Sequence, residues 1–198
     1  YALCIHETSY SAFGESVTVF EKFLNEFPTS PYAEKVSNYL VEVYMNTRSY
    51  DAALKSIDRI AKPSAQILEA KQKILFQLGT QSFANADFEQ ALKYLNQSIA
   101  IGQYNRQTKA DAYYWCGESY YRLNRMVEAA RDFNAYLQLT TQPNNEMYAL
   151  ANYNLGYIAF HRKDYTQASN YFQKYIQLEK GENTTALADA YNRIGDCH

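Results

Sequence analysis

The sequence has few of the residues from which catalytic and metal-binding sites are built. Only three cysteines and three histidines occur among its 198 residues, and they are scattered without the spacing of a metal site. The sequence also lacks a glycine-rich phosphate loop, a Gly-x-Ser-x-Gly turn and a His-Glu-x-x-His motif. We therefore expect no catalytic, cofactor-binding or metal-binding residues, and a protein that is not an enzyme.

An excess of charge of one sign is lacking as well. The 19 Lys and Arg residues are interspersed with 21 Asp and Glu residues, so the net charge is only −2. Without a basic cluster, the chain has no electrostatic footprint for nucleic acid. No apolar stretch is long enough to span a bilayer. The sequence thus predicts neither a nucleic-acid partner nor a membrane-spanning segment.

Signals for β-strands are missing, because the chain has no sustained alternation of apolar and polar residues and no Asn-Gly turn. Glycine and proline, the residues that interrupt helices, are scarce, with seven and four copies. All four prolines fall in joints between helical stretches, where a helix has to end. They are Pro28, Pro31, Pro63 and Pro143. These absences favour an all-α protein.

What the sequence does contain is a pattern that recurs every 37 to 39 residues. Its first position is small in most copies: Cys4, Val41, Gly79, Gly117, Gly156 and Gly195. Nine residues later comes a bulky apolar side chain: Phe13, Tyr50, Phe88, Met126 and Tyr165. A small residue and a second bulky one follow: Ser16 and Phe20, Ala53 and Ile57, Ala91 and Leu95, Ala129 and Phe133, Ala168 and Phe172. A fixed period of this length indicates a repeat architecture, in which each unit buries its apolar face against its neighbours.

Each unit contains two amphipathic stretches joined by a short polar turn. In the unit that ends near residue 181, the turn is 161–164 and the second stretch has its apolar residues at helical spacing. Gly79, Gly117 and Gly156 lie inside first stretches, where glycine costs about 1 kcal/mol relative to alanine. We interpret these glycines as points where the first helix closely approaches the Ala-containing part of the second.

The pattern resembles the consensus of the tetratricopeptide repeat (TPR) family. The resemblance rests on Leu155-Gly156, Tyr165, Ala168 and Phe172, and it recurs along essentially the whole chain. It implies an all-α superhelix, a solenoid of antiparallel helix pairs with about 11 helices. It also implies that residues 1–198 form a single solenoid segment. The expected repeats are 1–29, 30–63, 64–103, 104–143 and 144–181, followed by a lone first helix at 183–198.

The long period and the joint at 27–33 look like the repeats of bacterial envelope TPR proteins, such as outer-membrane assembly lipoproteins and Tol–Pal partners. That resemblance implies a location in the bacterial periplasm or cell envelope, with the cytoplasm as the alternative. Because the pattern is cut within a repeat at both ends, we expect a segment of a longer array. The lone helix at 183–198 predicts end-to-end self-association, unless this helix is itself the polar cap of the solenoid.

The function that the resemblance implies is that of an interaction scaffold, which binds a protein or peptide in a concave groove lined by first helices. The residues that the repeat phase places there are mostly aromatic, as in contact hot spots. They are Tyr39, Phe76, Phe83, Tyr114, Trp115, Glu118, Tyr121, Arg122, Tyr153, Asn154, Tyr157, His161 and Arg193. Trp115, the only tryptophan, is the strongest candidate. The alternative is that several of these aromatic side chains only fill the seams between repeats.

Other modes of binding are weighed against this one. One TPR subset binds a C-terminal carboxylate through five Lys, Asn and Arg residues, of which only Asn154 and Arg193 have counterparts here. Tyr114, Glu118 and Asp189 stand at the other three positions, so an anionic terminus would meet acidic side chains. Exposed Tyr and Trp rings leave carbohydrate binding as an alternative function. A further alternative is a regulatory arm whose catalytic or DNA-binding domain lies outside this segment.

Overall fold

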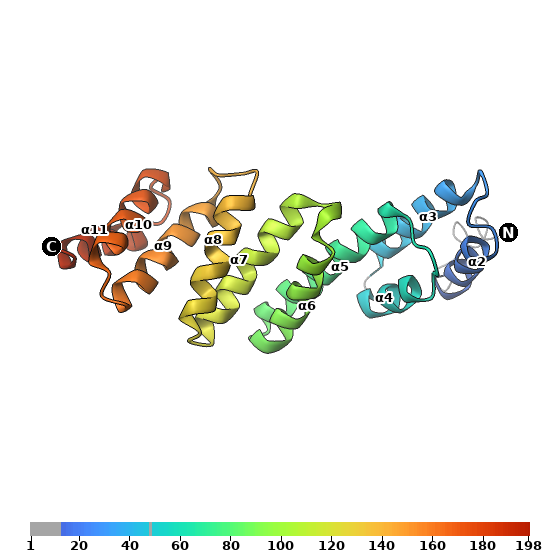
Figure 1. The fold of residues 1–198 in the computed structure, drawn as a ribbon, viewed down its shortest axis with the longest axis horizontal. Helices are drawn as coiled ribbons and strands as arrows, with labels where there is room; N and C mark the ends of the chain where they lie inside the picture. Colours follow the sequence, from blue (N-terminus) through green and yellow to red (C-terminus); the bar gives the residue numbers. More distant parts are fainter. Residues whose placement is uncertain (1–12, 48) are drawn as a thin grey trace.

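The computed structural model describes residues 13–47 and 49–198, and in this part of the chain it contains helices and no strands (Figure 1). The all-α prediction is therefore confirmed. The α-helices are α2 (Phe13–Glu26), α3 (Ala33–Asn46), α4 (Tyr50–Asp58), α5 (Ala65–Ala84), α6 (Phe88–Ala100), α7 (Arg106–Arg122), α8 (Met126–Leu139), α9 (Glu146–His161), α10 (Tyr165–Leu178) and α11 (Thr184–Asp196). A short 3-10 helix, η1 (Gly102–Tyr104), precedes α7. Residues 1–12, including Cys4 of the first predicted repeat, lie outside the described residues.

The helices form an elongated row, with the described N-terminal helix and the C-terminus at opposite ends (Figure 1). Helix α2 packs on α3, and from α4 to α11 each helix packs on the next one in the chain. Helix α5 also contacts both α3 and α7. No helix in the described ranges is long and apolar enough to cross a membrane. The row is the architecture expected of a repeat solenoid, whose core grows along one axis.

The local sequence explains where the helices begin. Six of them start after a residue whose side-chain oxygen accepts a hydrogen bond from a backbone N–H of the first turn, which satisfies a donor that has no partner within the helix. These capping residues are Ser64, Asp87, Asn105, Asn145, Asp164 and Asn183. The turns between paired helices contain Ala86, Asn124 and Lys163, each with a φ close to +60°. These three turns thus share one backbone geometry.

Gly79, Gly117 and Gly156 permit the close helix packing that the sequence suggested. A Cβ on Gly117 would lie 2.8 Å from the ring of Phe133, and one on Gly156 would lie 2.8 Å from the ring of Phe172. At Gly79 it would lie 2.5 Å from the side chain of Leu95. Each contacted residue lies one turn after the alanine, on the same face of the second helix, so the expected close approach is confirmed. The bulky side chain fills the space between the paired helices.

Candidate partner-binding face

The 13 predicted groove residues lie on the first helix of each pair, from α3 to α11. Tyr39 lies on α3, and Phe76 and Phe83 lie on α5. Helix α7 carries five of the residues, α9 carries four, and α11 carries Arg193. We call the surface formed by α3, α5, α7, α9 and α11 the first-helix face. Its polar and aromatic contacts are concentrated in three places.

The first is a central aromatic cluster that joins α5 to α7, made of Phe83, Tyr114 and Trp115. The ring of Trp115 lies 4.9 Å from that of Phe83 and 5.4 Å from that of Tyr114, both in edge-to-face geometry. The guanidinium carbon of Arg122 lies 5.8 Å from the centre of the Phe83 ring. The sequence-predicted Trp115 is thus held on both sides, and its side chain stays partly exposed.

The second is a bridge between α7 and α9 that is centred on the carboxylate of Glu118. Asn154 donates its amide N–H to Glu118 Oε1 over 2.5 Å, and the Tyr114 hydroxyl donates to the same oxygen over 3.2 Å. Arg122 forms an ion pair with the other oxygen at 3.6 Å. Glu118 is only 8% exposed, so these partners satisfy a carboxylate that would otherwise be costly to bury.

The third is a bridge between α9 and α11 that is centred on Asp189. The Tyr153 hydroxyl donates to Asp189 Oδ2 over 2.8 Å, and the Tyr157 hydroxyl donates to the same oxygen. Arg193 lies 3.6 Å from the other carboxylate oxygen. The sequence placed Asp189 at a position of the carboxylate-binding subset but did not predict it as a shared acceptor, because the tyrosines that donate to it lie on another helix.

Burial fixes the protonation of the tyrosines in these bridges. Loss of hydration raises the pKa of Tyr114, and the neighbouring Glu118 raises it further. Burial and the hydrogen bond to Asp189 raise the pKa of Tyr153 and Tyr157 in the same way. All three hydroxyls therefore keep their protons near neutral pH and act as hydrogen-bond donors.

The remaining predicted residues differ in how far they reach the surface. Arg122 and His161 are exposed, whereas Tyr121 is partly buried and Tyr114 is only 4% exposed. Phe76 packs against the central core. Tyr39 lies apart from the others, stacked on Phe20 of α2 at 6.0 Å with the ammonium of Lys35 5.9 Å from its ring.

A groove with a volume of about 500 Å³ lies on the same face, between α3 and α5. Its walls are two facing helical stripes: Asn38, Val41, Glu42, Met45 and Asn46 from α3, and Gln66, Glu69, Ala70 and Lys73 from α5. We call it the α3–α5 groove. The residues that the structure describes contain no cluster of three or more His, Cys, Asp or Glu side chains able to hold a metal ion.

Comparison with known proteins adds to this geometry. No curated protein matches the sequence. The structure of BtubC (BKLC) from P. vanneervenii is similar, with a TM-score of 0.56 and 12% sequence identity over 94% of this chain and 80% of that one. YrrB, described as a TPR protein with an unusual peptide-binding site, has a TM-score of 0.50 and 18% identity over 96% of this chain and 88% of its own. At these identities the similarity concerns the fold alone.

The sequence itself matches two models of the tetratricopeptide repeat family. One covers residues 76–146 and the other 149–181, so together they account for just over half of the chain. The matched ranges contain the helix pairs in which Gly79, Gly117 and Gly156 pack closely against the second helix. The chain therefore belongs to the tetratricopeptide repeat family.

Proposed function

We propose that this protein is a non-enzymatic interaction scaffold that binds an extended peptide or a partner helix on its first-helix face. The observation that carries the proposal is the central aromatic cluster beside the partly buried Tyr121 and the exposed Arg122. Aromatic rings held by packing give contact area at low entropic cost, and arginine is enriched with them in interface hot spots. The peptide-binding site named for YrrB lends support by analogy of fold.

The two carboxylate bridges give the scaffold its rigidity. Each ties neighbouring first helices through side chains about one repeat apart in sequence, namely Asn154 to Glu118 and Tyr153 to Asp189. A face held in this way can bind a partner without first becoming ordered, which lowers the entropic cost of association. The same carboxylates argue against recognition of an anionic C-terminus, because they occupy positions where that mode needs cationic or amide groups.

Two finer predictions from the sequence remain proposals. The division into repeats 30–63, 64–103, 104–143 and 144–181 agrees with the period of the turns. The location in the bacterial envelope rests on the long repeat period and the joint at 27–33 alone.

The test is selection of peptides from a displayed random library on the immobilised chain, followed by titration of the selected peptides in solution. We expect Trp115→Ala and Tyr121→Ala each to weaken binding by more than about 2 kcal/mol, roughly 30-fold, as at other interface hot spots. Val127→Ala is the matched control, because Val127 is 63% exposed on α8, a second helix outside this face.

Circular dichroism must show that each variant keeps its helicity. Trp115 also packs on Phe83 and Tyr114, so Arg122→Gln provides a second substitution, at an exposed position, that leaves the three rings in place and sets no second carboxylate beside Glu118. Unchanged affinity in Tyr121→Ala and Arg122→Gln, with helicity intact, would contradict the assignment of binding to this face.

A further inference from the structure

We propose that the α3–α5 groove is a socket for an aromatic side chain of the bound partner, with a basic residue of the partner next to it. This inference rests on the proposed function, since it assigns one subsite within the first-helix face. Three observations support it. Equivalent positions differ between the repeats, side chains close the corresponding junction between α9 and α11, and the charges around the groove are unequal.

At two positions that line the groove, α3 has non-aromatic residues where the later first helices have aromatic ones. One period apart, the position of Asn38 is occupied by Phe76, Tyr114 and Tyr153. The position of Met45 is likewise aromatic in the later helices: Phe83, Tyr121 and Phe160. Asn38 is exposed and Met45 is 37% exposed, and both line the groove. The protein thus provides its own aromatic side chains at these positions in later repeats and leaves them out at this one.

The junction between α9 and α11 shows what such side chains do. There Tyr153 and Tyr157 both reach across to Asp189 of the next first helix. At the equivalent repeat positions, α3 has Asn38 and Glu42, and α5 has Lys73. All three line the α3–α5 groove. The shorter side chains of α3 leave open the space that tyrosines cross at the other junction. An aromatic ring from a partner would restore the missing contact.

The floor of the groove suits an aromatic ring. Val41, Met45 and Ala70 supply aliphatic and thioether surface between the two helices. Methionine sulfur makes favourable contacts with aromatic rings, and its flexible side chain adapts to a ligand. A groove of about 500 Å³ lies within the size range of small-molecule sites, so it can hold one large side chain together with adjacent backbone.

The charges around the groove favour a basic neighbour. Glu69 is already engaged, because it pairs with Lys73 at 2.8 Å and accepts a hydrogen bond from the side chain of Asn105 at 3.1 Å. These bonds hold the pKa of Glu69 below its usual value, so its carboxylate stays ionised. Glu42 is exposed and makes no hydrogen bond or ion pair with any residue that the structure describes. The free charge at the groove is therefore negative, which complements Lys or Arg.

The chain offers a direct probe of this site, because only three methionines occur and Met45 alone lines the groove. We would label the methionine methyl groups with ¹³C and titrate the chain with N-acetyl-Phe-Arg-amide. The Met45 methyl resonance should shift saturably under the ring current of the phenyl group. Those of Met126 and Met147, on α8 and α9, should not move. N-acetyl-Leu-Arg-amide and N-acetyl-Phe-Glu-amide should each bind at least threefold more weakly.

Two substitutions complete the test. Asn38→Tyr installs a residue that two later repeats carry at this position, so the chain should fold and the Met45 shift should disappear. Glu42→Gln should abolish the preference for Phe-Arg over Phe-Glu and keep the preference for Phe over Leu. Binding of Phe-Arg no tighter than either comparison dipeptide, or a Met45 shift that persists in Asn38→Tyr, overturns the socket.

The socket and the proposed function can fail separately. If Met45 does not respond, while selected peptides still bind and lose affinity in Tyr121→Ala, the socket is wrong and the scaffold function stands. If neither dipeptides nor selected peptides bind, both proposals are wrong.

Discussion

At the scale of single residues, the glycines of the repeat do not all have the same role. Gly156 faces the ring of Phe172, whereas a Cβ on Gly195 would meet nothing within 4 Å. We expect Gly156→Ala to lower the free energy of unfolding by about 1–3 kcal/mol, because a rigid ring has to move to admit the methyl group. Gly195→Ala should raise it by up to about 1 kcal/mol, because alanine favours the helical backbone. Urea denaturation followed by circular dichroism measures both. A loss of stability in both variants would contradict this distinction.

At the scale of the helix, the N-cap residue contributes to stability by accepting a hydrogen bond from the first turn. The Asp164 carboxylate accepts a hydrogen bond from the Gln167 N–H at 3.1 Å and caps α10 directly after the left-handed Lys163. Asp164→Ala should destabilise the protein by about 1 kcal/mol, and Asp164→Asn should preserve most of the stability because its amide oxygen can still accept the bond. The shift of the thermal midpoint in the two variants tests this, and equal losses would show that the hydrogen bond to the Gln167 N–H is not what stabilises the start of α10.

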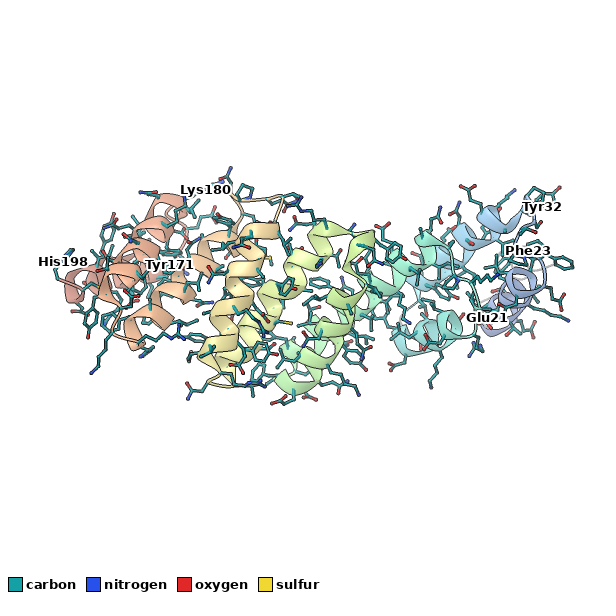
Figure 2. The ribbon with its side chains drawn as sticks, in the orientation of Figure 1. Glu21, Phe23, Tyr32, Tyr171, Lys180 and His198 are labelled. Carbon is teal, nitrogen blue, oxygen red and sulfur yellow. The ribbon has the colours of Figure 1, made fainter. Side chains whose placement is uncertain are left out.

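At the scale of the whole molecule, α11 gives one end of the row an apolar surface. Tyr191 is 58% exposed there, and the site of Gly195 has no helix packed on it within the described residues. We therefore expect the 198-residue chain to self-associate through this end, with a mass that rises with concentration in light scattering. Tyr191→Lys should keep it monomeric. Tyr32→Lys is the matched control, because Tyr32 is 66% exposed near the opposite end (Figure 2). A concentration-independent monomer mass for the unmodified chain excludes the association.

The sequence by itself determined the architecture, because the repeat period, the capping residues and the turns are properties of short stretches of chain. Asp87, Asn105 and Asp164 cap the helices that their local sequence predicts. The period likewise placed the candidate residues on the first helices, since residues one repeat apart occupy equivalent positions in a solenoid.

Only the tertiary structure decided which of those residues reach the surface and which bind one another. Tyr114 and Glu118 are buried beneath the face on which the sequence placed them, and Asp189 proved to be the acceptor for two tyrosines. The α3–α5 groove depends on Asn38 and Lys73, which are 35 residues apart in sequence and face each other because α3 packs on α5. Such contacts depend on the distance between helices, which the packing of the intervening helix sets and no local pattern records.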